Sequence, residues 1–188
     1  MNKKICFIIR GENDFLCQEV LHYISYLTVP EGYEIEYTIK QGKVGQAYDA
    51  GMKETDAIIK VYLDENIFLV DKELLLDVVD IFEQNKYIEI LGALGYKIAR
   101  NNDKEEYLSV GNCYKLGLQK GNENYDSSKI TRIEEVDALD VRCLFTCKDL
   151  KWQEIEDVVV NKKQLNNSKE TMAVILNKKE PWCLFDNE

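Results

Sequence analysis

Three consecutive oxygen-bearing side chains, Asp64, Glu65 and Asn66, interrupt an otherwise apolar stretch of the chain. The residues before them, Ala57–Leu63, form an apolar and partly β-branched run of the length of a buried strand. In open α/β proteins the carboxyl ends of buried parallel strands face the ligand crevice. Carboxylate and amide oxygens at such an end suit a hard cation and the phosphates it carries. The alternative is a strand that ends in a solvated acidic turn.

Strand and helix patterns alternate along the chain and must position this turn. The predicted strands are Ile5–Ile9, Tyr33–Ile39, Ala57–Leu63, Ile88–Leu94, Val136–Cys147 and Met172–Leu176. The predicted helices are Phe15–Leu27, Gln46–Glu54 and Asp71–Phe82, with Asp14 and Asp71 as N-caps. This alternation favours βαβ units and a largely parallel sheet in one α/β domain over residues 1–188. The polar segment 99–131 is predicted to be a loop-rich excursion that contains a hairpin.

Composition narrows the class of protein. Of the 188 residues 45% are hydrophobic and 31% are charged, which is typical of a globular domain. The net charge of −10 argues against a nucleic-acid-binding surface, although a phosphate could still be held locally. No apolar run approaches the ~20 residues of a transmembrane helix, and the apolar run near the N-terminus is too short for a signal peptide. We therefore expect a cytoplasmic protein, whose acidic surface is a candidate site for a protein partner.

Several segments resemble, in order and spacing, the glycosyltransferase-like family related to family 2 glycosyltransferases. They include Lys4–Ile8, Leu27–Tyr33, Ala47–Met52, Ala57–Phe68, Ile90–Gly95, Val136–Ala138, Asp149–Trp152 and Pro181–Cys183. The resemblance implies the GT-A fold, a three-layer α/β sandwich with a mainly parallel mixed sheet. It also implies a nucleotide-diphospho-sugar over the first strands, with Mn²⁺ or Mg²⁺ bridging its phosphates.

The resemblance places candidate binding residues along the first half of the chain. Arg10, Glu12 and Asn13 follow the first strand, where GT-A proteins contact the nucleotide, and Asp64 ends the third. Asp49 stands where the family pattern has an asparagine, which brings another carboxylate near the donor. For the metal, Asp64 and Asn66 are the better pair, because on an extended segment they share a face and Glu65 points oppositely.

Catalytic and acceptor residues are expected in the second half. Asp137 is the candidate base for an acceptor hydroxyl, and the alternative is a strand-edge carboxylate hydrogen-bonded to backbone. Asp149 and Trp152 are candidates to line the acceptor pocket, since an aromatic face can stack on a sugar; the alternative for the tryptophan is packing. Trp182 is expected to fill the core, and His22 to have no ligand role.

Departures from the family pattern leave two functions open. Asn66 replaces the usual metal-binding aspartate, residues 158–170 contain no aspartate to serve as the family's base, and Phe185 replaces a histidine. The first hypothesis is a metal-assisted glycosyltransferase acting on an unknown acceptor. The second is a catalytically inactive binding or assembly module that keeps the fold. A flavodoxin-like domain is a third and less favoured alternative, because it fits the 99–131 excursion poorly.

Overall fold

The computed structural model describes residues 3–101, 104–111, 113–115, 133–152, 155, 157–161, 164, 171–175 and 183–185. Its helices are α1 (Asp14–Ser25), α2 (Val44–Met52) and α3 (Leu74–Gln84). A seven-stranded sheet contains β1 (Lys3–Arg10), β2 (Tyr33–Lys40), β3 (Ile59–Asp64), β5 (Ile88–Gly92), β9 (Ile133–Glu135), β11 (Cys143–Thr146) and β13 (Thr171–Ile175). A four-stranded sheet contains β6 (Leu94–Asn101), β7 (Lys104–Gly111), β10 (Ala138–Asp140) and β12 (Val159–Asn161). A three-stranded sheet contains β4 (Ile67–Leu69), β8 (Cys113–Lys115) and β14 (Cys183–Phe185).

The large sheet is mixed, in the order β2-β1-β3-β11-β5-β13-β9. Strand β1 pairs in parallel with β2 and β3, and β5 pairs in parallel with β13. Strand β11 runs antiparallel between β3 and β5, and β9 runs antiparallel to β13. The predicted α/β class and mixed sheet are confirmed, with parallel pairing in three of these six contacts. The antiparallel β11 brings its first residues to the edge at which β1 and β3 end.

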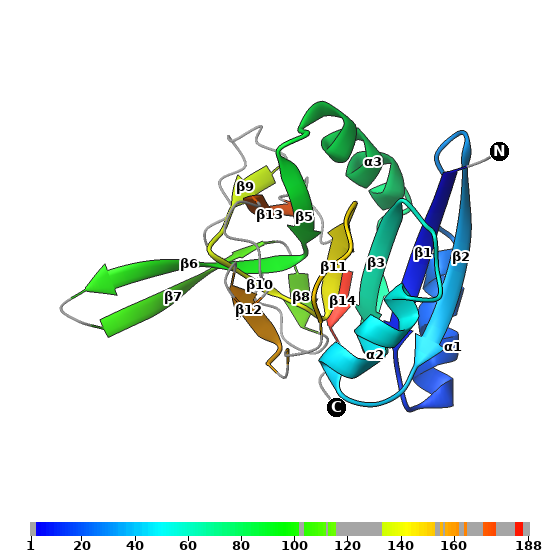
Figure 1. The fold of residues 1–188 in the computed structure, drawn as a ribbon, viewed down its shortest axis with the longest axis horizontal. Coiled ribbons are helices and arrows are strands. Elements are labelled where there is room, and N and C mark those ends of the chain that lie inside the picture. The colour runs from blue at the N-terminus through cyan, green and yellow to red at the C-terminus, as the bar shows by residue number, and fades with distance from the viewer. Residues whose placement is uncertain are drawn as a thin grey trace.

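Alternating side chains of β1 separate two buried clusters on opposite faces of this sheet. Ile5, Phe7 and Ile9 belong to the cluster that also contains the buried faces of α1 and α3. Cys6 and Ile8 belong to the other cluster, together with α2 and buried residues of β10 and β12. The period-two alternation of a strand therefore produces a three-layer sandwich. Figure 1 shows the hairpin of β6 and β7 projecting from this body.

Other predicted elements are shifted or divided in the structure. The hairpin of β6 and β7 occupies part of the predicted 99–131 excursion, and residues 116–132 lie outside the described part of the chain. The predicted strand Val136–Cys147 is two strands, β10 and β11, which belong to different sheets. Trp182 and most of 161–170 also lie outside the described residues.

Both predicted helix caps are corrected by one or more positions. Asn13, not Asp14, is the N-cap of α1, and its Oδ1 accepts hydrogen bonds from Phe15 N at 3.0 Å and Leu16 N at 3.4 Å. Asp71 lies ahead of α3, where its Oδ1 accepts from Glu73 N at 2.9 Å. Asparagine and aspartate cap equally well, so sequence alone could not choose between neighbours.

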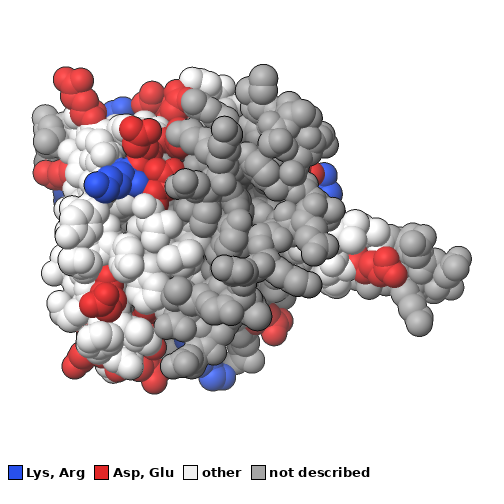
Figure 2. All heavy atoms as spheres, turned by 180° about the vertical axis from the view of Figure 1, so that it is seen from behind, with Lys and Arg blue, Asp and Glu red and all other residues white. Residues whose placement is uncertain are grey.

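Acidic side chains are more evident than basic ones on the described part of the face in Figure 2. Among the described helices none is both long and apolar enough to cross a membrane.

Candidate functional site

Arg10 and Asp64 meet at the carboxyl ends of β1 and β3. The register of these parallel strands places the two residues directly opposite each other. Arg10 Nε donates a hydrogen bond to Asp64 Oδ2 at 2.9 Å, and Arg10 Nη2 makes an ion pair with the same oxygen. The Asp64 side chain is only 4% exposed, whereas that of Arg10 is 29% exposed. A buried carboxylate is thus held by a guanidinium that reaches the surface.

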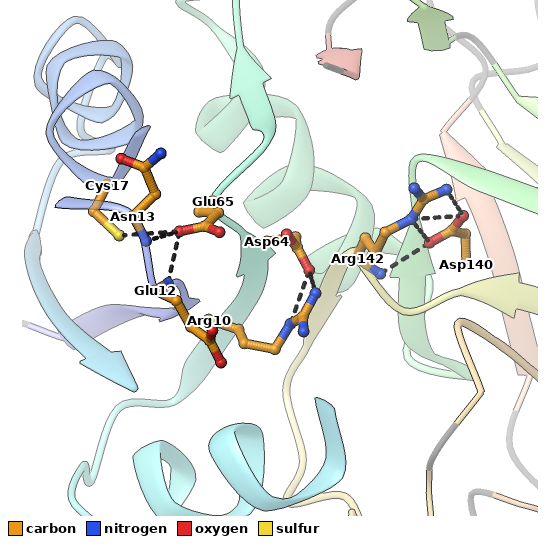
Figure 3. A network of polar contacts seen from close by, with 8 residues as sticks. All are labelled: Arg10, Glu12, Asn13, Cys17, Asp64, Glu65, Asp140 and Arg142. Atoms are coloured by element: carbon orange, nitrogen blue, oxygen red, sulfur yellow. Dashed lines mark hydrogen bonds and ion pairs between the residues drawn. The ribbon is translucent and has the colours of Figure 1, made fainter. Parts of the chain in front are cut away.

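A second ion pair, between Asp140 and Arg142, lies beside the first (Figure 3). Arg142 Nε is 3.0 Å from Asp140 Oδ1, and Arg142 Nη2 is 2.6 Å from Asp140 Oδ2. The Asp140 side chain is 2% exposed. Asp64 N donates to Arg142 O at 2.9 Å, so the turn between β10 and β11 is attached to the end of β3. Two carboxylates and two guanidinium groups therefore meet where the two sheets adjoin.

Burial controls the electrostatics of this cluster. It raises the pKa of Asp64 above the ordinary value of 3.8, although the hydrogen bond from Arg10 opposes the rise. Burial alone would lower the pKa of Arg10, but the hydrogen bond and charge of Asp64 raise it overall. The hydrogen bond to Asp140 likewise raises the pKa of Arg142. Both arginines remain cationic, as binding of an anionic diphosphate requires.

Tyr48 of α2 forms part of the buried wall near Asp64. Its side chain is fully buried, and burial followed by the negative charge of Asp64 raises the pKa of its hydroxyl. Its ring centroid lies 5.1 Å from that of Tyr62 and 5.0 Å from that of Trp152. The hydroxyl of Tyr48 has no hydrogen-bond partner among the described residues. These three rings hold α2 against the sheet beneath the two ion pairs.

Glu65 points away from the ion pairs and fixes the loop between β1 and α1. Its Oε2 accepts hydrogen bonds from Glu12 N and Asn13 N, each at 2.7 Å, and lies 3.8 Å from Cys17 Sγ. A Cβ at Gly11 would lie 2.3 Å from Cys17 Sγ and 2.9 Å from Glu65 Oε2. The loop can approach Glu65 this closely only because residue 11 has no side chain.

The oxygens at the end of β3 fit a hard cation with few protein ligands. Both Arg10 contacts end on Asp64 Oδ2, which leaves Oδ1 as the oxygen to face a cation. Asn66 Oδ1 is buried without a hydrogen-bond partner among the described residues. No group of three or more His, Cys, Asp or Glu side chains in the described residues could hold a metal ion. Most remaining ligands would come from phosphates and water, as is usual for Mg²⁺.

Other predicted donor and base residues lie around this cluster without joining it. Asp49, the residue after Tyr48, forms an ion pair with Lys53 at 2.6 Å. Glu12 and Asn13 contact Glu65 through their backbone amides. Asp137 is exposed, and its Oδ2 accepts from Ile98 N at 2.9 Å. Asp137 thus has the backbone-bonded geometry that was the alternative to a base, and its catalytic role stays a prediction.

The predicted acceptor residues do not form a pocket here: Asp149 lies away from this end of the sheet, and Trp152 is buried beneath it. Asp149 Oδ1 lies 2.7 Å from Lys60 Nζ, four residues before Asp64 on β3 and therefore ~13 Å away along the strand. Trp152 is fully buried against Tyr48 and Tyr62, so its ring faces cannot stack on a sugar. The expectation that Trp152 lines an acceptor pocket is corrected to packing. A Cβ at Gly45 of α2 would lie 2.2 Å from Trp152 O, which shows how closely that helix packs there.

Sequence reasoning missed Asp140, Arg142 and the buried Tyr48. A signal was present, because an acidic and a basic residue two positions apart interrupt an apolar strand pattern at 136–147. Two residues of opposite charge two positions apart can pair, here across the turn between β10 and β11, and burial of such residues usually requires pairing.

Comparison with known families agrees with this architecture. Residues 6–188 match the family described as "Glycosyltransferase like family". No curated protein sequence matches the chain at a significant level.

Three solved proteins illustrate the structural likeness. A197 from STIV superposes with a TM-score of 0.50 at 12% identity, over 99% of this chain and 95% of that one. TarS 1-349 from S. aureus in complex with UDP superposes with a TM-score of 0.54 at 11% identity, over 98% of this chain and 61% of that one. The mannosyltransferase PcManGT from Pyrobaculum calidifontis, in complex with GDP-Man and Mn²⁺, gives a TM-score of 0.42 at 13% identity, over 50% of this chain and 36% of that one, too weak to support an inference. At these identities the likeness shows the shared fold.

Proposed function

The chain belongs to the glycosyltransferase-like family, and we propose that it binds a nucleotide-diphospho-sugar at the carboxyl ends of β1 and β3. The observation that carries the proposal is the contact between Arg10 and Asp64 at that edge, with Arg142 beside it. Ligands of open α/β sheets bind at the carboxyl ends of strands. The complexes of TarS with UDP and with UDP-GlcNAc support this choice of ligand.

The two arginines supply the positive charge that a diphosphate needs. Guanidinium groups form bidentate, charge-assisted hydrogen bonds with phosphate oxygens. In the structure Asp64 and Asp140 neutralise them. An arriving diphosphate competes with Asp64 for Arg10, whose side chain reaches the surface. Exchange of Asp64 for phosphate would leave both oxygens of the carboxylate, and its full charge, for a cation.

Asp64 and Asn66 would hold that cation through their Oδ1 atoms. A bound Mn²⁺ or Mg²⁺ would offset the negative charge that develops on a leaving diphosphate. Because Asn66 carries no charge, the protein contributes a single anionic ligand from this segment. Metal binding should therefore be weak without the nucleotide and stronger with it.

Transfer of the sugar to an acceptor is the finer part of this proposal. An acceptor hydroxyl oxygen would form a bond to the anomeric carbon, the bond from that carbon to the diphosphate would break, and a carboxylate would take the hydroxyl proton. Asp140 is buried and pairs with Arg142, so it lies closer to the two arginines than Asp137, which bonds to Ile98 N.

A catalytically inactive binding module is the second candidate function. It is favoured by the engagement of all three carboxylates: Asp64 and Asp140 with arginines, and Asp137 with the Ile98 amide. An engaged carboxylate must lose its partner before it can accept a proton from an acceptor.

Calorimetric titration with UDP and UDP-GlcNAc, with and without Mn²⁺, tests the proposal. We expect saturable binding that Mn²⁺ strengthens and that Arg10→Met weakens by about tenfold, one charge-assisted contact being involved. Lys40→Met is the matched control, because Lys40 lies opposite Arg10 on β2 and pairs with Glu54 instead of Asp64. Absence of nucleotide binding by the folded wild-type protein would refute the proposal. Hydrolysis or transfer of the sugar, measured by UDP release, separates the enzyme from the inactive module.

A further inference from the structure

A groove of about 570 Å³ lies on the four-stranded sheet, apart from the donor residues discussed above. Its lining consists of Tyr96, Tyr107, Ala138, Asp157, Val158, Val159, Asn161 and Gln164. Figure 1 shows β10 and β12 at the base of the hairpin that β6 and β7 form. The volume is within the range of small-molecule sites.

Strand register places this groove and Asp140 on one face of the sheet. Ala138 pairs with Asn161 on one side and with Tyr96 on the other. Asp140 pairs with Val159, two residues along the same strands. Side chains two residues apart in a strand point to the same face, about 6.6 Å from each other along it. The groove thus begins close to the Asp140–Arg142 pair and extends toward the hairpin.

The chemistry of the lining suits a neutral saccharide. Tyr96 and Tyr107 meet edge to face with ring centroids 6.2 Å apart, and Tyr107 is 55% exposed. The Tyr107 ring offers a flat apolar surface for the C–H face of a sugar ring, with Tyr96 packed against it at an interplanar angle of 77°, and tyrosine adds a polar hydroxyl. Among the described lining residues Asp157 is the single charged one, and its negative charge disfavours anionic ligands.

Two carboxamides at the edge of the groove are held by backbone N–H groups. Asn161 N donates to Gln164 Oε1 at 3.0 Å, and Gln164 N donates to Asn161 Oδ1 at 3.2 Å. This reciprocal pair fixes the orientation of both side chains before any ligand arrives. Preorganised amides next to exposed aromatic rings are the few convergent polar groups that a small-molecule site needs.

We propose that this groove is a saccharide-binding site for a neutral sugar and that, given the proposed donor site, it holds the acceptor. The end of the groove near Asp140 would bring an acceptor hydroxyl toward Arg10 and Arg142. Tyr107 would stack on the sugar ring farther from the reacting centre, with Tyr96 packed against its ring. Acceptor binding is thereby assigned to the four-stranded sheet in place of Asp149 and Trp152.

An array of defined neutral and anionic oligosaccharides, followed by NMR titration with the tightest binder, tests this proposal. We expect binding of neutral saccharides and a loss of affinity of about tenfold in Tyr107→Ala, the effect of one lost stacking contact. Tyr37→Ala is the matched control, since Tyr37 is 58% exposed on β2 and does not line the groove. Asp157→Asn should preserve neutral binding and admit anionic sugars.

Three outcomes would overturn the saccharide site: no binding on the array, preference for anionic sugars, or an affinity unchanged in Tyr107→Ala. UDP titration of the same variants keeps the two proposals separate. Loss of UDP affinity in Tyr107→Ala would place the nucleotide in the groove and contradict the proposal. Saccharide binding that depends on Tyr107 in a protein that does not bind UDP would refute the donor site and leave the saccharide site standing.

Discussion

Arg10 donates two contacts to Asp64 Oδ2 from the directly opposite position on the neighbouring parallel strand. This pair occupies the place at which nucleotide diphosphates bind to open α/β sheets. The guanidinium neutralises the same carboxylate that would ligate a divalent cation. Arginine and metal are therefore competitors for Asp64, and the outcome of that competition determines how the protein uses a metal.

Replacing Arg10 by methionine should strengthen binding of Mn²⁺ to the nucleotide-free protein. The substitution keeps an apolar stem and removes the charge that competes for Asp64. We expect affinity to rise by about tenfold, measured by calorimetry, which corresponds to ~1.4 kcal/mol. Lys40→Met removes one positive charge from the adjacent strand and should leave affinity nearly unchanged. Equal effects of the two variants would mean that general charge, and not the ion pair, limits metal binding.

The Asp140–Arg142 pair should contribute strongly to stability when one partner is removed. Asp140→Ala leaves a partly buried guanidinium without its carboxylate, so the free energy of unfolding should fall by about 3 kcal/mol. Lys53→Ala removes one partner of an exposed pair on α2 and should cost less than ~0.5 kcal/mol. Urea denaturation measures both. A similar small loss for the two variants would contradict the buried arrangement of Asp140.

The raised pKa of Asp64 predicts a specific pH dependence of stability. The folded state holds the Asp64 proton more tightly than the unfolded state, whose pKa is near 3.8. The stabilising contribution is therefore complete below that value and is lost as pH rises through the folded pKa. The difference in unfolding free energy between wild type and Asp64→Asn should fall as pH rises above about 4.

Asp56 provides a control of opposite sign for this pH dependence. Its hydrogen bond from Lys4 lowers the pKa of Asp56, so its contribution appears as pH rises. The difference between wild type and Asp56→Asn should increase as pH rises toward about 4, below the range in which that of Asp64→Asn decreases. If the difference between wild type and Asp64→Asn also increased with pH, the burial assigned to Asp64 would be ruled out.

Trp152 should affect stability and leave acceptor affinity unchanged. Its side chain is fully buried between Tyr48 and Tyr62. Trp152→Ala should lower the free energy of unfolding by about 3–5 kcal/mol, as expected for a large aromatic core residue. Phe15→Ala, at a side chain 70% exposed, should change it far less. If Trp152→Phe altered saccharide affinity at unchanged stability, the acceptor role first predicted for Trp152 would be restored.

Sequence periodicity predicted the elements that carry Arg10 and Asp64, because apolar alternation locates buried strands well. Glu65 does point away from Asp64, as its bonds to Glu12 N and Asn13 N show, but residues 65 and 66 form a turn and not the extended segment on which that prediction rested. The division of Val136–Cys147 between two sheets was not predictable, since both strands are apolar and the turn at 141–142 has no glycine or proline. The pairing of Asp140 with Arg142 depends on that turn. The position of Trp152 depends on contacts with α2 that are distant in sequence.

The most direct test of the donor site is a crystal structure of the protein grown with UDP-GlcNAc and Mn²⁺ at saturating concentrations. We predict the diphosphate within hydrogen-bond distance of Arg10 and Arg142, with Asp64 turned from Arg10 toward the cation. A nucleotide bound elsewhere, with the Arg10–Asp64 contact intact, would contradict the account.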